Sequence, residues 1–306
     1  MNYEKCAQME IAVRPISHGL GAAVTGVDLT KPLDDAQIAS IRKAFLDHLM
    51  LVFPGQCLKP EELIRFGRIF GDLDDHRALP FYRHPNWPEI FLITNRQIGG
   101  KSSTTKDTGR SWHSDHSFTT HPSMITMLHC QEIPPAGGTT LFTNMYKAYE
   151  TLSPGLKSIL DNLEAVHSLG YHMSWSKYFR NRDPAQVEKM KTLSPPVAQP
   201  VVRVHPETNR KALYVSEAQT SNFVGMTPDE SQGLLNFLFK HSVQPEFTYR
   251  HNWTVNDLVM WDNRCSMHLA PADYSHDQPR HMHRVTVLGK PCGRFLNEEE
   301  LALSAN

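Results

Sequence analysis

A histidine and an aspartate stand two positions apart in the segment Trp112-His113-Ser114-Asp115. In an extended chain, residues i and i+2 project to the same side, so His113 and Asp115 can bind one cation together. Imidazole with carboxylate suits Fe(II), Mn(II) or Zn(II), whereas calcium prefers oxygen ligands alone. A chain with 17 histidines contains such pairs by chance, and the open alternative is a surface loop with an Asx turn.

Further candidates lie in the C-terminal part of the chain. His268 follows a predicted strand over residues 257–261 and a short polar turn, where it could add a third ligand. Arg280 comes twelve residues later and begins a β-like segment, in which it shares a face with Arg284. Buried arginines need anionic partners, and their planar fork matches a carboxylate. The open alternative is a solvent-facing edge strand, where both arginines would do little.

Apolar spacing and capping residues predict four helices among the elements that must position these side chains. The helices are expected to begin after Asp34, at Pro60, at Ser153-Pro154 and at Thr227, which opens a capping-box sequence. Gly71 is expected to end the second helix.

The other segments are short and β-like, separated by Pro, Gly, Asn or Asp. They cover residues 51–53, 90–94, 124–130, 140–143, 201–205, 212–216, 247–250, 257–261 and 284–288. Many short strands without regular strand–helix alternation disfavour a Rossmann sheet or a (β/α)8 barrel. The pattern predicts a mainly β fold with α-helices packed outside, a jelly roll or related double sheet. No repeat or linker divides the chain, so residues 1–306 are expected to form one domain.

Composition narrows the class of protein. The 31 basic and 32 acidic residues nearly cancel, which disfavours binding to nucleic acid or an anionic membrane surface. Five dispersed cysteines form no Cys-x-x-Cys motif, and no targeting segment or membrane-spanning apolar run is found. A soluble, cytoplasmic enzyme is expected, and the 17 histidines favour a metal or proton-transfer site.

Several motifs together resemble the taurine dioxygenase and 2,4-dichlorophenoxyacetate dioxygenase family of Fe(II)/2-oxoglutarate-dependent oxygenases. In chain order they are Gly21-Ala22-Ala23-Val24-Thr25-Gly26-Val27-Asp28-Leu29, Phe70-Gly71-Asp72-Leu73, Trp112-His113-Ser114-Asp115, Gly137-Gly138-Thr139-Thr140, Trp261-Asp262-Asn263-Arg264 through His268, and Arg280 with Arg284. One motif alone would be weak, but their order and spacing together are specific. The fold that the resemblance implies is the double-stranded β-helix, a jelly roll.

The resemblance also implies roles for individual residues. His113, Asp115 and His268 match the iron ligands of the family, so they would be the catalytic metal centre. Thr140 and Arg280 match the positions that hold the distal carboxylate of 2-oxoglutarate. The cofactors implied are Fe(II), 2-oxoglutarate as co-substrate, and O2.

Substrate binding is where the sequence departs from the taurine enzyme. His76 and Arg284 match positions that bind the anionic head of the substrate. However, Gly109 and Leu79 stand where the taurine enzyme has Asn and Tyr, so an organic anion of a different shape is expected. The usual Gly-Gly-Asp-Thr motif has Thr139 in place of the aspartate and thereby loses a charge.

The leading prediction is therefore a dioxygenase that hydroxylates a small organic anion, such as a sulfonate, alkyl sulfate or aryloxyalkanoate, and releases succinate and CO2. One alternative is a jelly-roll protein that binds a metal without turnover, and another is a zinc hydrolase that uses the same three ligands. Dimers and tetramers are common among relatives, so a homo-oligomer is compatible with the resemblance, but the sequence does not fix the oligomeric state.

Overall fold

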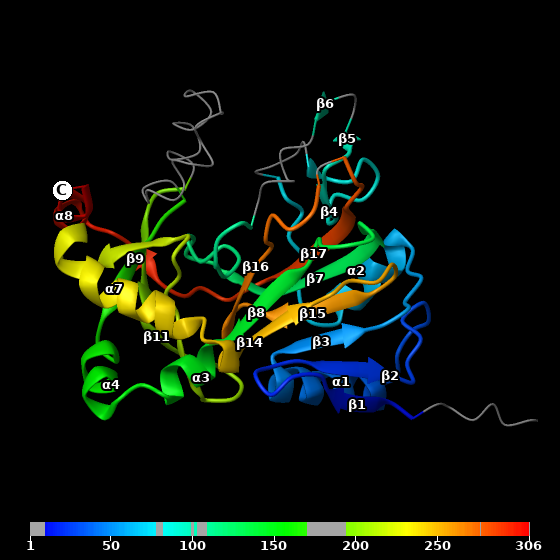
Figure 1. The fold of residues 1–306 in the computed structure, drawn as a ribbon, viewed down its shortest axis with the longest axis horizontal. Coiled ribbons are helices and arrows are strands. Elements are labelled where there is room, and N and C mark those ends of the chain that lie inside the picture. The colour runs from blue at the N-terminus through cyan, green and yellow to red at the C-terminus, as the bar shows by residue number, and fades with distance from the viewer. Residues whose placement is uncertain are drawn as a thin grey trace, which may run out of the picture.

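The computed structural model of the protein describes residues 10–77, 82–98, 101–102, 109–169, 194–275 and 277–305. Strands make up most of the regular structure, and helices pack around them (Figure 1). The mainly β character predicted from the sequence is confirmed.

The largest sheet has seven strands in the order β1-β2-β3-β15-β7-β17-β4 (Figure 1). In that order the strands are Ala12–Pro15, Ala22–Thr25, Met50–Phe53, Leu258–Asp262, Ser123–Glu132, His281–Leu288 and Phe91–Thr94. Neighbours pair antiparallel, except β2 and β3, which are parallel. Arg284 belongs to β17, which lies between β7 and β4, and Arg280 directly precedes this strand and is buried, so the solvent-facing edge-strand alternative is wrong for both.

Smaller sheets complete the β structure. A three-stranded sheet contains β14 (Thr248–His251), β8 (Thr140–Asn144) and β16 (Ser266–Leu269). A four-stranded sheet contains β13 (Thr220–Phe223), β9 (Glu164–His167), β10 (Val197–Pro200) and β18 (Arg294–Phe295). Two-stranded pairs join β11 (Val202–Val204) to β12 (Lys211–Leu213) and β5 (Gln97–Ile98) to β6 (Lys101–Ser102).

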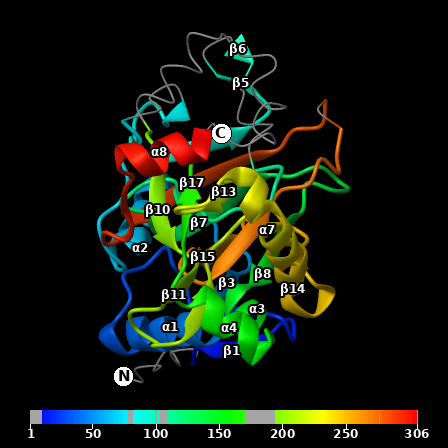
Figure 2. The ribbon, with the colours of Figure 1, turned by 90° about the vertical axis from the view of Figure 1, so that its left-hand side faces the viewer.

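The helices are α1 (Asp35–His48), α2 (Pro60–Arg68), α3 (Met145–Glu150), α4 (Pro154–Leu160), α7 (Pro228–Ser242) and α8 (Glu298–Ala305), with a 3-10 turn, η3 (Pro245–Phe247). The four predicted helices are confirmed, and side chains of Asp34, Ser153 and Thr227 cap three of them. Helix α2 ends at Arg68, before Gly71, so the predicted end was three residues too late. Helix α8, which the sequence did not predict, lies beside the four-stranded sheet (Figure 2). None of the described helices combines the length and the apolar character that a membrane crossing requires.

The seven-stranded sheet is buried on both faces. On β15, Val259 and Trp261 belong to one hydrophobic core. Phe142 of β8 and Met267 of β16 belong to the same core, so the three-stranded sheet lies over this face. The alternate residue Met260 belongs to a second core together with residues of α1 and α2. This arrangement places β7, β15 and β17 opposite β8 and β16, with the functional side chains between them.

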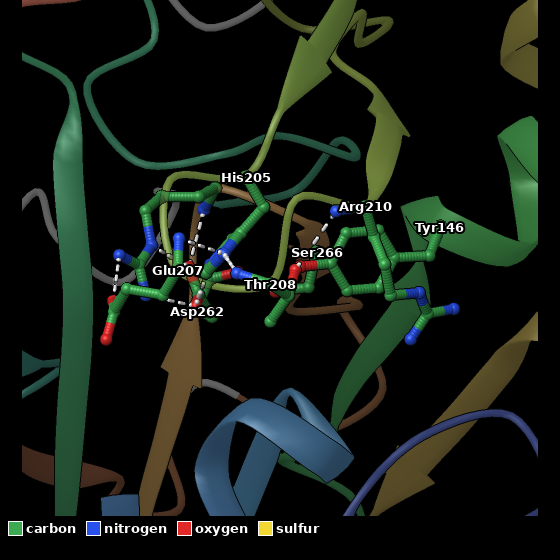
Figure 3. A network of polar contacts seen from close by, with 8 residues as sticks. Tyr146, His205, Glu207, Thr208, Arg210, Asp262 and Ser266 are labelled. Carbon is green, nitrogen blue, oxygen red and sulfur yellow. Dashed lines mark hydrogen bonds and ion pairs between the residues drawn. The ribbon is translucent and has the colours of Figure 1, made fainter. Parts of the chain in front are cut away.

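A buried polar network fixes the turn between β15 and β16 (Figure 3). Asp262 accepts hydrogen bonds from Arg264 Nε and Nη2 at 2.8 and 2.7 Å, and His205 Nε2 lies 3.0 Å from the same carboxylate. Backbone N–H groups of Glu207 and Thr208 donate to His205 Nδ1. The ring proton is therefore on Nε2 and points to Asp262. These hydrogen bonds hold the backbone of the turn that precedes β16.

Candidate active site

His113, Asp115 and His268 come together at one place. Two backbone hydrogen bonds join His113 to His268 of β16, at 3.1 and 2.9 Å, and their ring centroids lie 4.1 Å apart. The Nε2 atoms of the two histidines lie 3.8 and 3.9 Å from the Asp115 carboxylate oxygens. One donor atom from each residue lies within 4.8 Å of the others, close enough for all three to reach one ion.

The electrostatics of this group suit a divalent cation. Burial lowers the pKa of His113, and burial together with His113 lowers the pKa of His268 to about 3. Burial alone would raise the pKa of Asp115, but Arg284 and the nearby histidines hold it well below its usual range. His113 Nδ1 lies 2.8 Å from the Ser111 carbonyl oxygen and donates to it, which leaves the Nε2 lone pair free. Two neutral imidazoles and a carboxylate therefore form the donor set.

Two residues that sequence reasoning missed hold Asp115 in place. The buried Thr126 hydroxyl of β7 donates to Asp115 Oδ2 at 2.6 Å. Asn263 accepts from the Asp115 backbone N–H at 3.1 Å and donates to the Thr126 hydroxyl at 2.9 Å. The only sequence signal for Asn263 was its place in the turn that precedes His268. Nothing in the sequence singled out Thr126.

A cavity of about 100 Å³ opens beside these donors. Both residues predicted to bind 2-oxoglutarate, Thr140 and Arg280, line it. Thr140 Oγ1 accepts a hydrogen bond from Trp253 Nε1 at 3.0 Å, so its own proton remains available to a ligand. Arg280 is 6% exposed, and no carboxylate of the described residues lies within 4.0 Å of its guanidinium. A buried guanidinium in this setting is suited to an anionic ligand.

The two residues predicted to bind the substrate meet at one aromatic ring. The His76 ring lies 5.2 Å from the Phe91 ring, and Arg284 Cζ lies 5.9 Å from the same ring. His76 Nε2 and Arg284 Nη2 are buried, and neither makes a hydrogen bond to any residue that the structure describes. Arg284 Nη2 lies 3.3 Å from Asp115 Oδ1, so the arginine faces the metal-ligand group.

Gly109 and Leu79 are the two positions at which the sequence departs from the substrate pocket of the taurine enzyme. Gly109 lines the cavity with a φ of +74°, and a Cβ there would lie 3.4 Å from His113 Cε1. A side chain at this position would be strained by the positive φ and would lie in contact with the His113 ring. Leu79 lies outside the described residues.

A second set of metal-ligating residue types, His205, Asp262 and Cys265, has donor atoms within 4.8 Å of one another. Arg264 occupies the Asp262 carboxylate with two hydrogen bonds, and His205 uses both ring nitrogens (Figure 3). Burial raises the pKa of the Cys265 thiol well above its usual value. This group is therefore a structural support for the turn.

Comparison with known proteins agrees with this geometry. Residues 12–286 match the family described as "Taurine catabolism dioxygenase TauD, TfdA family". The chain belongs to this family. It is 32% identical to the alpha-ketoglutarate-dependent 2,4-dichlorophenoxyacetate dioxygenase of Cupriavidus pinatubonensis, over 92% of this chain and 98% of that protein. It is also 32% identical to an alkylsulfatase of Acinetobacter baylyi, over 92% of this chain and 86% of the relative.

Solved structures of the TauD/TfdA family resemble the whole chain. A taurine dioxygenase from Burkholderia xenovorans superposes with a TM-score of 0.77 at 32% identity and covers 96% of this chain and 99% of its own. AAD-2, solved with Mn(II) and N-oxalylglycine, gives a TM-score of 0.81 at 32% identity and covers 94% and 100%. The enzyme class predicted from the sequence is confirmed, and a binding protein without turnover is not favoured.

Proposed function

We propose that the protein is an Fe(II)- and 2-oxoglutarate-dependent dioxygenase that hydroxylates a small organic anion. The observation that carries this proposal is that one cavity joins the His113–Asp115–His268 group to Arg280, a buried arginine that forms no ion pair within the described part of the chain. A metal centre alone would serve many reactions, but a clamp for a dicarboxylate beside it favours 2-oxoglutarate. The relatives named above, which include a 2,4-dichlorophenoxyacetate dioxygenase, support the same assignment.

Each residue has a separate task in this reaction. His113, Asp115 and His268 hold the ion from one side and leave its other positions open. Bound Fe(II), with 2-oxoglutarate and O2, supplies the oxidising power that hydroxylates a C–H bond, and succinate and CO2 are released. Arg280 binds the far carboxylate of 2-oxoglutarate by a charge-assisted pair, and the Thr140 hydroxyl donates a further hydrogen bond. These side chains contribute by placing the reactants.

The substrate is a small organic anion that carries an apolar group. Among the described residues, His76 Nε2 has no hydrogen-bond partner, and Arg284 Nη2 faces Asp115 Oδ1 at 3.3 Å without a hydrogen bond. Two buried nitrogen atoms of this kind suit a sulfonate, sulfate or carboxylate head. Ile93 and Leu128 line the cavity that Arg284 enters and offer an apolar surface to the remainder of the substrate. The alkylsulfatase and a further relative, the (S)-phenoxypropionate/alpha-ketoglutarate-dioxygenase of Sphingobium herbicidovorans, support an organic anion of this kind.

We also propose that the enzyme has a jelly-roll fold, forms one domain and works in the cytoplasm. The arrangement of β7, β15 and β17 opposite β8 and β16 supports a jelly roll, and the match over residues 12–286 supports one dioxygenase domain. Cys57, Cys130, Cys265 and Cys292 are free thiols, which supports a reducing, cytoplasmic location. A homo-oligomer is part of the proposal only by analogy with relatives.

The test is a screen of sulfonates, alkyl sulfates, aryloxyalkanoates and phosphonates, with succinate release as the readout. A productive substrate should raise succinate release, and this should require Fe(II), 2-oxoglutarate and O2. Without oxygen, Fe(II) and 2-oxoglutarate together should give a weak visible charge-transfer band. A folded protein that shows no band would refute the proposal, and product formation without 2-oxoglutarate or oxygen would favour the zinc hydrolase.

A further inference from the structure

The loop of residues 270–275 lies across the turn of residues 137–140, which leads into β8. Asp273 makes the contact. The Gly138 N–H donates to its Oδ1 at 2.8 Å, and the Thr139 hydroxyl donates to its Oδ2. Although 134 residues separate Asp273 from Thr139, both oxygens of one carboxylate are bound to adjacent residues of one short turn. Hydrogen bonds to a charged acceptor are among the stronger ones, so this contact fastens the loop.

The backbone of the same loop packs closely against Gly137. Its φ is +80°, a conformation that favours glycine, and a Cβ there would lie only 2.0 Å from the Asp273 carbonyl oxygen. The loop backbone therefore occupies the space that any side chain at position 137 would need. The backbone and the carboxylate of Asp273 are held by the same turn.

This loop forms one wall of the cavity assigned to 2-oxoglutarate. Ala270, Pro271 and Tyr274 line the cavity. Arg110 supports the other end of the loop, because its Nη1 donates to the carbonyl oxygens of Ala270 and Pro271 at 3.2 and 2.5 Å. The Ala270 N–H also donates to the Gly109 carbonyl oxygen at 2.8 Å. Asp273 therefore holds the end of the wall opposite to the one that Arg110 and Gly109 hold.

The turn that Asp273 grips also carries the residues of the clamp. The Gly138 carbonyl oxygen accepts a hydrogen bond from Arg280 Nε at 3.1 Å, and Thr140 lies two residues further on. Asp273 makes its hydrogen bonds to the turn and forms no ion pair with Arg280, as its carboxylate is not within 4.0 Å of that guanidinium. The charge of Arg280 thus stays available to a ligand, while its position depends on the turn.

We propose that Asp273 is a positioning residue for 2-oxoglutarate: it fastens the 270–275 loop to the 137–140 turn and so holds Arg280 and Thr140 at the spacing that the far carboxylate requires. This inference rests on the proposed function.

The experiment measures 2-oxoglutarate binding to the full-length, Mn(II)-loaded protein by calorimetry. Asp273→Ala should weaken 2-oxoglutarate binding about tenfold, the size of one hydrogen bond to a charged group. Mn(II) affinity, measured by EPR, should stay within about twofold of the wild type, because the three ligands do not touch Asp273. Asp229→Ala is the control, because it removes an exposed carboxylate in the first turn of α7 and should leave both affinities unchanged.

A double variant separates positioning from general loss of structure. Thr139→Asp alone would place two carboxylates in contact and weaken 2-oxoglutarate binding. Asp273→Thr alone would remove the carboxylate that binds the turn, and it should weaken 2-oxoglutarate binding as well. The double variant Thr139→Asp with Asp273→Thr restores one carboxylate and one hydroxyl in exchanged places, and it should recover most of the affinity. Unchanged 2-oxoglutarate affinity in folded Asp273→Ala, or no recovery in the double variant, would overturn the inference. Failure of the wild type itself to bind 2-oxoglutarate would instead overturn the proposed function.

Discussion

Replacement of Thr126 by valine tests how the structure prepares Asp115 for a metal ion. The threonine is completely buried, and its hydroxyl donates to Asp115 Oδ2 at 2.6 Å. Valine has nearly the same shape but cannot donate, and water has no access to replace the lost hydroxyl. The variant therefore frees Asp115 to turn and leaves Asn263 Nδ2 without its acceptor.

The size of the effect follows from the kind of bond removed. A hydrogen bond to a charged group contributes about 1.5–3 kcal/mol, and loss of a residue that supports a metal ligand usually lowers metal affinity by about 10–100-fold. We expect Thr126→Val to raise the dissociation constant for Mn(II) by roughly 10–50-fold, which corresponds to about 1.4–2.3 kcal/mol. The unpaired Asn263 amide should also lower the free energy of unfolding by about 1–3 kcal/mol.

Mn(II) titration followed by EPR measures this affinity without the need for turnover. Thr143→Val is the matched control, since Thr143 is equally buried in β8 and its hydroxyl donates to the Ser242 carbonyl oxygen at 2.6 Å. Both variants should lose similar stability in urea unfolding, but only Thr126→Val should lose metal affinity. If the two variants bind Mn(II) equally well, Thr126 does not orient Asp115 and the reasoning fails.

Three other perturbations have distinct outcomes. Arg280→Ala should raise the 2-oxoglutarate concentration needed for half-maximal succinate release by about 100-fold or more, because a charge-assisted pair is lost; an unchanged requirement would remove Arg280 from the clamp. Arg284→Ala should weaken the primary substrate in steady-state assays, and an effect confined to 2-oxoglutarate would mean that the two arginines have exchanged roles. Burial lowers the pKa of His167 to about 3. Below about pH 6.5 this histidine takes up a proton in the unfolded chain but not in the folded chain. The free energy of unfolding therefore falls as the pH drops below about 6.5. His167→Gln should reduce the slope of unfolding free energy against pH by about 1.4 kcal/mol per unit between pH 6 and pH 4 in urea titrations, and an unchanged slope would show that His167 does not contribute.

Local sequence predicted the elements that local interactions determine. Asp34, Ser153 and Thr227 each begin a helix. The side chain of each accepts a hydrogen bond from the backbone N–H three residues later, which has no acceptor within the helix. The end of α2 was misplaced, because Phe70 and Gly71 continue the apolar pattern past the last helical residue, Arg68. Apolar spacing does not report where the backbone hydrogen bonds stop.

Contacts between distant segments could not be predicted in the same way. Strand β16 was missed because it has four residues and exists through pairing with β8. Arg280 and Arg284 could be placed on one face of a strand, but whether that face was buried depended on β17 lying between β7 and β4. Asp273 gave no signal, since its partner Thr139 lies 134 residues away.

The resemblance to a family connected residues that their spacing in the sequence could not connect. His113 and Asp115 form a short motif that also occurs by chance, and only the family pattern connected them to His268, more than 150 residues later. The structure places the backbones of His113 and His268 in direct hydrogen-bonded contact. Their roles as iron ligands remain predictions that the geometry supports.

A crystal structure of the protein with Mn(II) and 2-oxoglutarate bound tests the central claim most directly. We predict one ion in contact with His113, Asp115 and His268, with the far carboxylate of 2-oxoglutarate on Arg280 and Thr140. An ion bound elsewhere, or a 2-oxoglutarate molecule that does not touch Arg280, would contradict the account.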